Sequence, residues 1–287
     1  MNNGMVYWGG YRTYAKLNLS LFVYPKSSTG YHPIHGIFQS ISLFDTLTIH
    51  INPHKKEFKL TSTDLVLPTD ERNVLRNVYD RFSSQIPIGL HVSLEKRIPL
   101  GSGMGGASSN AAAFLSFLNG ILGWKKTTSQ LMRIAKSFGA DIPFFFSGGR
   151  ALVQGIGEKI RPLPPGPFEA FLLIHPGFSS STPAAFRLFD AQGPPFLRRP
   201  LAKSIQAGIG PNELKPAVFK AYPVLSKIEE KINSEYRKTV YMSGSGTTLF
   251  LPFVQKIHAQ ESLEKFRAIL PEYEMQVVEP TPCGFEL

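Results

Sequence analysis

The sequence has one cysteine, no long hydrophobic run and no long block of basic residues. Because Cys283 is the only cysteine among 287 residues, an intrachain disulfide and a cysteine-cluster metal site are excluded. No apolar stretch approaches the roughly 20 residues that a membrane-spanning helix needs. The first ten residues lack the basic-then-apolar order of a signal peptide, so we expect a cytoplasmic protein.

Acidic residues are scarce relative to basic ones. The chain has 31 lysines and arginines against 21 aspartates and glutamates, which gives a formal net charge of +10. Such a balance is typical of proteins that handle polyanionic small molecules and of proteins that bind nucleic acid. The basic residues are dispersed and show no zinc-finger spacing. Charge alone therefore leaves both interpretations open.

Strand and helix patterns alternate along the chain, which indicates an α+β architecture. Residues 14–24 alternate with a period of two, which predicts a strand with one buried face and with Lys16 and Asn18 on the other. Four prolines and one glycine in residues 162–167 predict a boundary between two domains, at 1–165 and 166–287. Further strands are expected at 37–51, 88–96, 150–154, 170–175, 240–242, 248–251 and 274–278, and helices at 73–82, 107–122, 128–138, 225–234 and 254–270.

A glycine-rich loop at residues 99–106 follows a predicted strand and opens the predicted helix at 107–122. Glycine lets backbone N–H groups crowd against phosphate oxygens, because no Cβ obstructs the approach. The helix N-terminus adds unpaired N–H donors and a partial positive charge. Ser108 and Ser109 supply hydroxyls in the first helical turn that can bind phosphate or Mg²⁺. We interpret the loop as an anion-binding site.

Other glycine loops fit this segment poorly. Gly101, Gly103 and Gly106 match a dinucleotide fingerprint, but no acidic residue lies between Glu95 and Asp141 to hold the ribose. Ala107 stands where a Walker A loop would have lysine. The His-Arg-Asp and Asp-Phe-Gly tripeptides of protein kinases do not occur. A plain tight turn remains the structural alternative, although it would not need four glycines followed by two serines.

Five segments together resemble the galactokinase, homoserine kinase, mevalonate kinase and phosphomevalonate kinase (GHMP) superfamily, and more closely its family of 4-diphosphocytidyl-2-C-methyl-D-erythritol kinases. The segments run in the family's order, from about residue 15 to residue 250. They are residues 15–19, 30–32, 99–112, 139–144 and 243–246. Met104, Ala107 and Thr29 depart from the usual family residues. Residues 190–209 match weakly, so no role is carried into them.

The resemblance implies a two-domain GHMP kinase fold. The N-terminal, ATP-binding domain would be ribosomal-protein-S5-like, and the C-terminal domain a ferredoxin-like α/β sandwich. The activity implied is ATP-dependent phosphorylation of the 2-hydroxyl of a cytidine diphosphate sugar alcohol, in the non-mevalonate route to isoprenoid precursors. Another GHMP kinase, of the homoserine or mevalonate type, is the alternative, and a nucleic-acid-binding module is a more distant one.

The resemblance also assigns roles to residues. Asp141, which precedes an apolar run, would accept the proton of the attacking hydroxyl, with Lys16 beside it; a capping or structural aspartate is the alternative. The ATP-binding residues implied are Pro99, Leu100, Gly101, Ser102, Gly103, Met104, Gly105, Gly106, Ala107, Ser108, Ser109, Asn73 and Lys96. The substrate-binding residues implied are Asn18, Tyr31, His32, Phe186, Ser243, Gly244, Ser245 and Gly246.

Within this set, Tyr31 and Phe186 would enclose the cytosine between two rings, and His32 would contact its polar edge. The histidines show no zinc-ligand spacing, so no metal held by the protein alone is expected. Mg²⁺ would arrive with ATP, held chiefly by phosphates. The expected partners are ATP and the small-molecule substrate, without nucleic acid or membrane, and the expected state is a monomer or weak homodimer.

Overall fold

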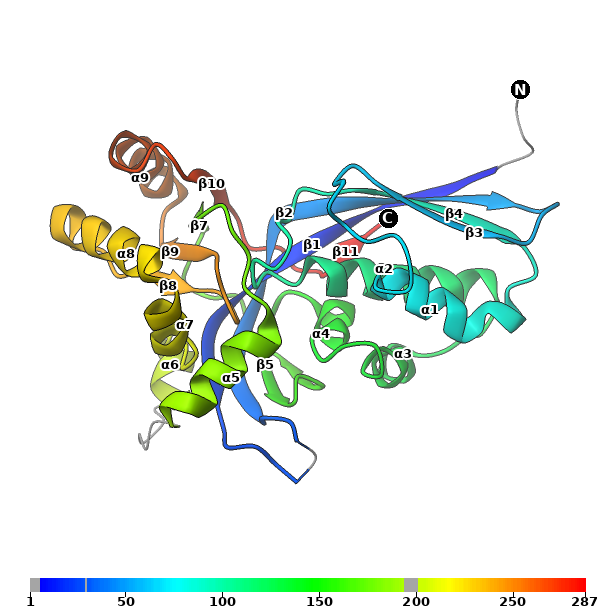
Figure 1. Ribbon diagram of the computed structural model, residues 1–287, viewed down its shortest axis with the longest axis horizontal. Coiled ribbons are helices and arrows are strands. Elements are labelled where there is room, and N and C mark those ends of the chain that lie inside the picture. The colour runs from blue at the N-terminus through cyan, green and yellow to red at the C-terminus, as the bar shows by residue number, and fades with distance from the viewer. Residues whose placement is uncertain (1–5, 29, 194–200) are drawn as a thin grey trace.

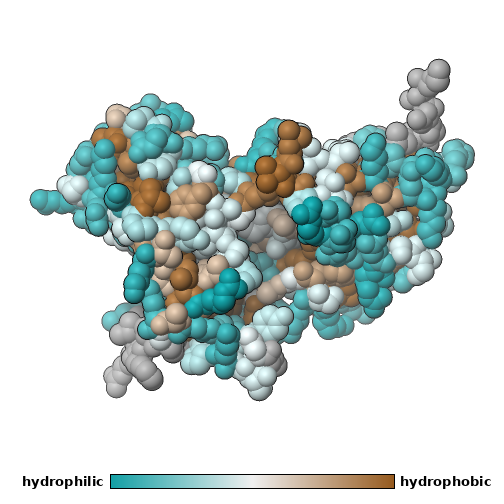
Figure 2. Space-filling view, in the orientation of Figure 1, coloured by the Kyte–Doolittle hydropathy of each residue, from teal (hydrophilic) through white to brown (hydrophobic). Residues whose placement is uncertain are grey.

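Two β-sheets, each accompanied by helices, form two lobes along the long axis of the molecule (Figure 1). The structure is a computed structural model that describes residues 6–28, 30–193 and 201–287. It has the α+β architecture that the sequence predicts. None of the described helices is both long and apolar enough to cross a membrane. On the face drawn in Figure 2, hydrophilic side chains dominate the outer surface of both lobes.

The first sheet has seven strands, and its main path runs in the order β11-β1-β2-β4-β3, with β5 and β6 attached through β2. Its strands are β1 (Val6–Val23), β2 (Ile34–Asn52), β3 (Phe58–Ser62), β4 (Gly89–Glu95), β5 (Arg150–Gly155), β6 (Lys159–Pro162) and β11 (Phe285–Glu286). The helices of this lobe are α1 (Val74–Phe82), α2 (Gly106–Ile121), α3 (Thr128–Ala135) and α4 (Ile142–Ser147), with the 3₁₀ turn η1 (Ser83–Gln85) after α1.

The second sheet has four strands in the order β10-β7-β9-β8. They are β7 (Ala170–His175), β8 (Tyr241–Met242), β9 (Leu249–Phe253) and β10 (Glu274–Val278). The helices of this lobe are α5 (Thr182–Gln192), α6 (Leu201–Ala207), α7 (Lys215–Ala221), α8 (Pro223–Tyr236) and α9 (Lys256–Ile269). Residues 163–169 connect the two sheets, and β11 returns the chain to the first sheet by pairing with β1. The predicted domain boundary at residue 165 falls in this connection and stays a prediction.

Strand β1 differs from its prediction because both faces of residues 13–23 are buried. Lys16, Asn18, Ser20 and Phe22, the side predicted to be open, are each at most 3% exposed. Residues 210–213 of the second lobe run beside the C-terminal half of β1, and their backbones form hydrogen bonds with the backbones of Leu19 and Leu21. The second lobe therefore covers one edge of β1, and its Gly244 lies against Lys16 and Asn18 on the polar face. A period of two shows that a strand has two unlike faces, but it cannot show what covers each face.

Other elements follow the sequence patterns closely, with differences at their ends. Residues 37–51 belong to the single strand β2, and Asn73 caps α1 by accepting a hydrogen bond from Leu75 N–H at 3.0 Å. Helix α3 ends at Ala135, three residues early, because Ser137 and Phe138 bond to carbonyls three residues back and tighten the last turn. The elements that the patterns missed are β3, β6, β11, η1, α4, α5, α6 and α7.

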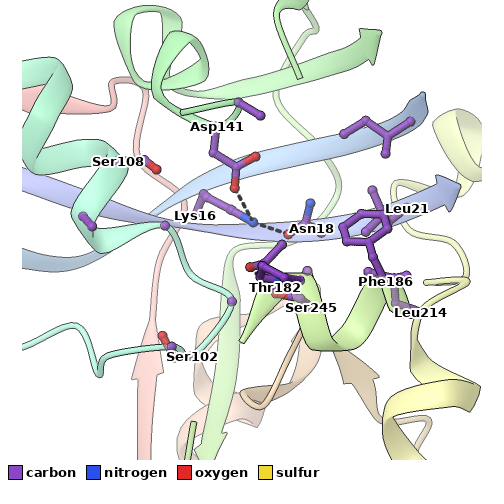
Figure 3. Close-up of a pocket in the computed structure, with 18 of the residues that line it drawn as sticks. Lys16, Asn18, Leu21, Ser102, Ser108, Asp141, Thr182, Phe186, Leu214 and Ser245 are labelled. Carbon is purple, nitrogen blue, oxygen red and sulfur yellow. Dashed lines mark hydrogen bonds and ion pairs between the residues drawn. The ribbon is translucent and has the colours of Figure 1, made fainter. Parts of the chain in front are cut away.

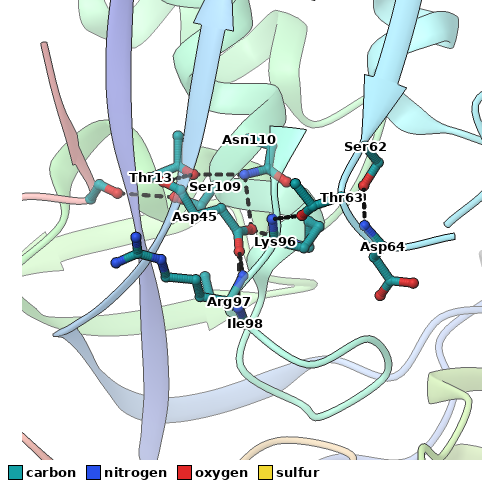
Figure 4. Close-up of polar contacts among 11 residues, drawn as sticks. Thr13, Asp45, Ser62, Thr63, Asp64, Lys96, Arg97, Ile98, Ser109 and Asn110 are labelled. Carbon is teal, nitrogen blue, oxygen red and sulfur yellow. Dashed lines mark hydrogen bonds and ion pairs between the residues drawn. The ribbon is translucent and has the colours of Figure 1, made fainter. Parts of the chain in front are cut away.

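A buried carboxylate ties β2 to the segment that leads into the glycine loop and to α2 (Figure 4). Asp45 Oδ1 accepts hydrogen bonds from the backbone N–H groups of Arg97 and Ile98, both at 2.9 Å. Asp45 Oδ2 accepts from the Asn110 side chain at 3.1 Å and pairs with the Lys96 ammonium. A buried charge must be paired in this way to be tolerated. The network therefore fixes the end of β4 and the start of the loop.

Replacing Asp45 by asparagine should destabilise the fold, because the buried Lys96 ammonium loses its counter-charge. We expect Asp45→Asn to lower the free energy of unfolding by about 3 kcal/mol, measured by urea denaturation. Asp80→Asn is the matched control, since it breaks an exposed ion pair with Arg76 and should cost less than about 1 kcal/mol. An equal loss in the two variants would contradict a buried, structural role for Asp45.

Candidate active site

A cavity of about 680 Å³ lies where the two lobes meet (Figure 3). Its wall is built by β1, the glycine loop, the residues before α4, the helix α5 and the loop that follows β8. These segments come from distant parts of the sequence. The cavity therefore exists only when both lobes are folded against each other.

Lys16 and Asp141 face each other in this cavity (Figure 3). Lys16 Nζ lies 3.5 Å from Asp141 Oδ2 and donates a hydrogen bond to the Asn18 side-chain oxygen. The Lys16 side chain is 3% exposed, whereas that of Asp141 is 35% exposed. Burial lowers the pKa of the Lys16 ammonium, and the Asp141 carboxylate opposes that shift. Asp141 precedes α4, yet its side chain makes no capping hydrogen bond. The capping alternative does not match this geometry.

The glycine loop lies beside this ion pair and leads into the N-terminus of α2. Gly101, Gly103 and Gly105 have positive φ angles of 61°, 78° and 74°, which favour glycine. A Cβ on Gly103 would lie 2.2 Å from the carbonyl oxygen of Ser243, so the loop packs directly against the loop after β8. The first residues of α2, together with Ser108, line the cavity. The helix N-terminus there suits a phosphate group.

The loop of residues 243–246 closes the other side of the ion pair. A Cβ on Gly244 would lie 2.9 Å from Asn18 Oδ1 and 3.2 Å from Lys16 Nζ, so only glycine fits without movement. Asn212 anchors the loop by donating to the Gly244 carbonyl at 2.7 Å. Gly244 and Ser245 line the cavity, whereas Ser243 and Gly246 lie behind it.

Four residues of the predicted ATP set lie differently from expectation. Ser109 is fully buried and donates to the Gly284 carbonyl at 3.0 Å, so its hydroxyl is not available to a phosphate. Met104 is buried in the core, and Asn73 caps α1 rather than lining the cavity. Lys96 lines the cavity, but its ammonium is paired with Asp45. The other predicted ATP residues line the cavity.

The aromatic end of the cavity brings together the three residues predicted to bind the base. Tyr31, His32 and Phe186 all line the cavity, but Phe186 stacks on the His32 ring, with centroids 5.2 Å apart and planes at 24°. Tyr31 is 61% exposed. Enclosure of a base between Tyr31 and Phe186 stays a prediction. Thr29, which precedes this end, lies outside the described residues.

Several cavity residues carry no signal in the sequence. The Thr182 and Ser245 hydroxyls are 2.9 Å apart and join α5 to the loop after β8. Lys26 and Arg187 add positive charge to the aromatic end. Thr182, Lys26 and Arg187 belong to no glycine motif and to no strand with clear alternation, whereas Ser245 lies in the glycine-rich segment 243–246. Within the described parts of the chain, no group of three or more histidine, cysteine, aspartate or glutamate side chains is placed to hold a metal ion.

Comparisons with known proteins find similar sequences and similar structures. The family model for the N-terminal domain of GHMP kinases matches residues 72–149. A 4-diphosphocytidyl-2-C-methyl-D-erythritol kinase of Clostridium botulinum (strain Alaska E43 / Type E3) is 33% identical, over 89% of this chain and 95% of the relative. A kinase of the same name from Methylacidiphilum infernorum is 36% identical, over 83% and 84%.

Solved structures show the same likeness. A crystal structure of 4-(cytidine 5'-diphospho)-2C-methyl-D-erythritol kinase superposes with a TM-score of 0.74 at 28% identity, covering 94% of this chain and 99% of the other. A homoserine kinase from Cytophaga hutchinsonii superposes with a TM-score of 0.71 at 18% identity, covering 100% and 98%, and that likeness shows the fold alone.

Gly103→Val should prevent the two loops from packing, because its side chain would collide with the Ser243 carbonyl at a φ angle that valine rarely adopts. We expect ATP binding, measured by calorimetry, to fall below detection. Gly120→Val is the matched control, since a Cβ there meets no atom within 4 Å, and it should bind ATP normally. Normal ATP binding by Gly103→Val would contradict the arrangement of the loops.

Proposed function

Because the chain belongs to the 4-diphosphocytidyl-2-C-methyl-D-erythritol kinase family of the GHMP kinases, we propose that it transfers the γ-phosphoryl group of ATP to the 2-hydroxyl of 4-diphosphocytidyl-2-C-methyl-D-erythritol. One observation supports this most directly. A single cavity is lined by the Lys16–Asp141 pair, the glycine loop and the aromatic residues at its far end. A kinase for a cytidine compound needs all three in one space.

Asp141 is the proton acceptor in this proposal. As the 2-hydroxyl oxygen bonds to the γ-phosphorus, the bond to ADP breaks and the hydroxyl proton passes to the carboxylate. The partly exposed position of Asp141 leaves a path for a substrate hydroxyl, whereas Lys16 is enclosed. The Lys16 ammonium stabilises the negative charge on the transferring group, since it is desolvated and fixed in place. Asn18 holds that ammonium through its side-chain oxygen.

The glycine loop and the first turn of α2 hold the ATP phosphates in this proposal, with Ser108 as the hydroxyl that faces the cavity. Mg²⁺ comes with ATP, and the oxygen atoms of Ser108 and Asp141 are donors of the kind that this ion prefers. When bound, Mg²⁺ neutralises phosphate charge. We further propose that the chain acts in the cytoplasm, as a monomer or weak homodimer, without a nucleic-acid or membrane partner.

The function is tested by ADP release from the purified protein with ATP and Mg²⁺. The acceptors, offered separately, are 4-diphosphocytidyl-2-C-methyl-D-erythritol, mevalonate, homoserine and galactose. We expect turnover with the cytidine compound alone. Turnover with another acceptor would support a kinase activity but reject the cytidine compound as its substrate. No turnover with any acceptor would reject the proposed activity.

Asp141→Asn should abolish proton acceptance while keeping the shape of the side chain. We expect kcat to fall by about 10²- to 10⁴-fold, the range typical of general-base catalysis. Binding of ATP and of the cytidine compound, measured by calorimetry, should change little, because the substitution is nearly isosteric. A kcat near the wild-type value would remove Asp141 as the base.

Tyr31→Ala should weaken binding of the cytidine compound, because the exposed ring at the cavity mouth would no longer stack on the base. Stacking of a base on an aromatic ring contributes roughly 1–3 kcal/mol, so KM for this substrate should rise about tenfold. The KM for ATP serves as the internal control and should stay unchanged. An unchanged KM for the cytidine compound would reject stacking by Tyr31.

A further inference from the structure

The segment between β1 and β2, which we call the base loop (residues 24–28 and 30–33), is closed by its own hydrogen bonds. Tyr24 N–H donates to the Pro33 carbonyl at 2.8 Å, and Ser27 N–H donates to the Tyr31 carbonyl at 2.9 Å. His32 Nδ1 lies 2.8 Å from the Tyr24 carbonyl oxygen. Because a carbonyl can only accept, Nδ1 carries a hydrogen and the ring is held from its Nδ1 side.

Helix α5 presents three side chains of one face to this histidine. Phe186, Phe189 and Asp190 are spaced i, i+3 and i+4, so they lie on the same side of the helix. Phe186 stacks on the His32 ring, and Phe189 meets it edge-on with centroids 5.9 Å apart. Asp190 Oδ1 lies 3.1 Å from His32 Nε2, and Oδ2 lies 2.7 Å from Lys26 Nζ. The ring is thus stacked on Phe186, contacted edge-on by Phe189 and approached at Nε2 by Asp190.

His32 Nε2 nevertheless has no hydrogen-bond partner among the described residues. The side chain is 5% exposed and lines the cavity, and its 3.1 Å approach to Asp190 does not have hydrogen-bond geometry. A buried polar atom left in this state is costly unless a ligand satisfies it. The Nε2 atom therefore has capacity left for a ligand atom, and the Asp190 carboxylate attracts the ring when Nε2 also carries a hydrogen.

Asp190 itself is held as a charged group. The hydrogen bond from Lys26 lowers the pKa of the Asp190 carboxyl, and the neighbouring His32 acts in the same direction. Lys26 belongs to the base loop, so one carboxylate contacts two residues of that loop. The contact joins the second lobe to the aromatic end of the cavity.

We propose that Asp190 is a positioning residue for substrate recognition: it fixes the His32 imidazole, and with it the base loop, in the orientation that contacts the cytosine edge. This inference rests on the proposed function, because it takes the cytidine compound as the ligand of this end of the cavity. Asp190 acts through His32 and does not touch the reacting atoms. The motifs assign no role to residues 190–209, and none of them points to this carboxylate.

Asp190→Asn tests the proposal, since it keeps the size of the side chain and removes its charge. We expect KM for the cytidine compound to rise about tenfold, while kcat and KM for ATP stay within about twofold. Asp80→Asn, the same change at an exposed ion pair of α1, is the matched control and should leave all three constants unchanged. Thermal unfolding of each variant shows whether it is folded, and Asp190→Ala provides a second variant if Asp190→Asn is not.

A double-mutant cycle separates positioning from a general structural role. If Asp190 acts through His32, adding Asp190→Asn to His32→Ala should raise KM by less than about twofold. The proposal is overturned if the two effects multiply, if KM for ATP rises equally, or if Asp190→Asn leaves KM for the cytidine compound unchanged. Absence of wild-type turnover would instead reject the proposed function, so the two failures can be told apart.

Discussion

The buried ammonium of Lys16 is the constraint on which the site depends. A charge enclosed between two lobes needs compensation, and it receives it from the Asp141 carboxylate at 3.5 Å, the Asn18 oxygen and the face of Phe38, whose ring centroid is 5.0 Å away. The backbone crowds the same group, since a Cβ on Gly105 or Gly244 would lie 3.2 Å from Lys16 side-chain atoms. The two glycine loops are therefore required for packing around the lysine as well as for any phosphate. Desolvation makes that charge more effective on a transferring phosphoryl group.

Strand β1 contacts both lobes, and these contacts place Lys16 at the junction between them. In its C-terminal half, β1 pairs with β2 along one edge and borders residues 210–213 of the second lobe along the other edge. The Asp45 network fixes the start of the glycine loop on the first lobe, while Asn212 and Thr182 fix the loop after β8 on the second. Each wall of the cavity is thus anchored by buried or partly buried polar contacts. Helix α5 then meets the base loop at His32, which makes the aromatic end of the cavity an interface between the lobes.

The sequence predicts most of this arrangement where a residue's role is local. Glycines before an alanine-rich helix predict the loop, and period-two alternation correctly places Lys16 and Asn18 on one face. Local patterns fail where the partner is distant in the sequence. The position of Ser109 predicts a phosphate ligand, but its hydroxyl donates a hydrogen bond to the carbonyl of Gly284 in the C-terminal segment. The stacking of Phe186 on His32 depends on how α5 packs, and no motif encodes that. Short elements such as α4 and β11 were missed because six or fewer residues carry too little periodicity.

In the proposed complex, the cytidine compound lies between the base loop and Asp141, and ATP lies on the glycine loop. A crystal structure with 4-diphosphocytidyl-2-C-methyl-D-erythritol and a non-hydrolysable ATP analogue tests it most directly. We expect the cytosine at Tyr31 and His32, and the 2-hydroxyl oxygen about 2.6–3.2 Å from an Asp141 carboxylate oxygen. A cytosine bound elsewhere, or a 2-hydroxyl turned away from both Asp141 and the γ-phosphoryl group, would contradict it.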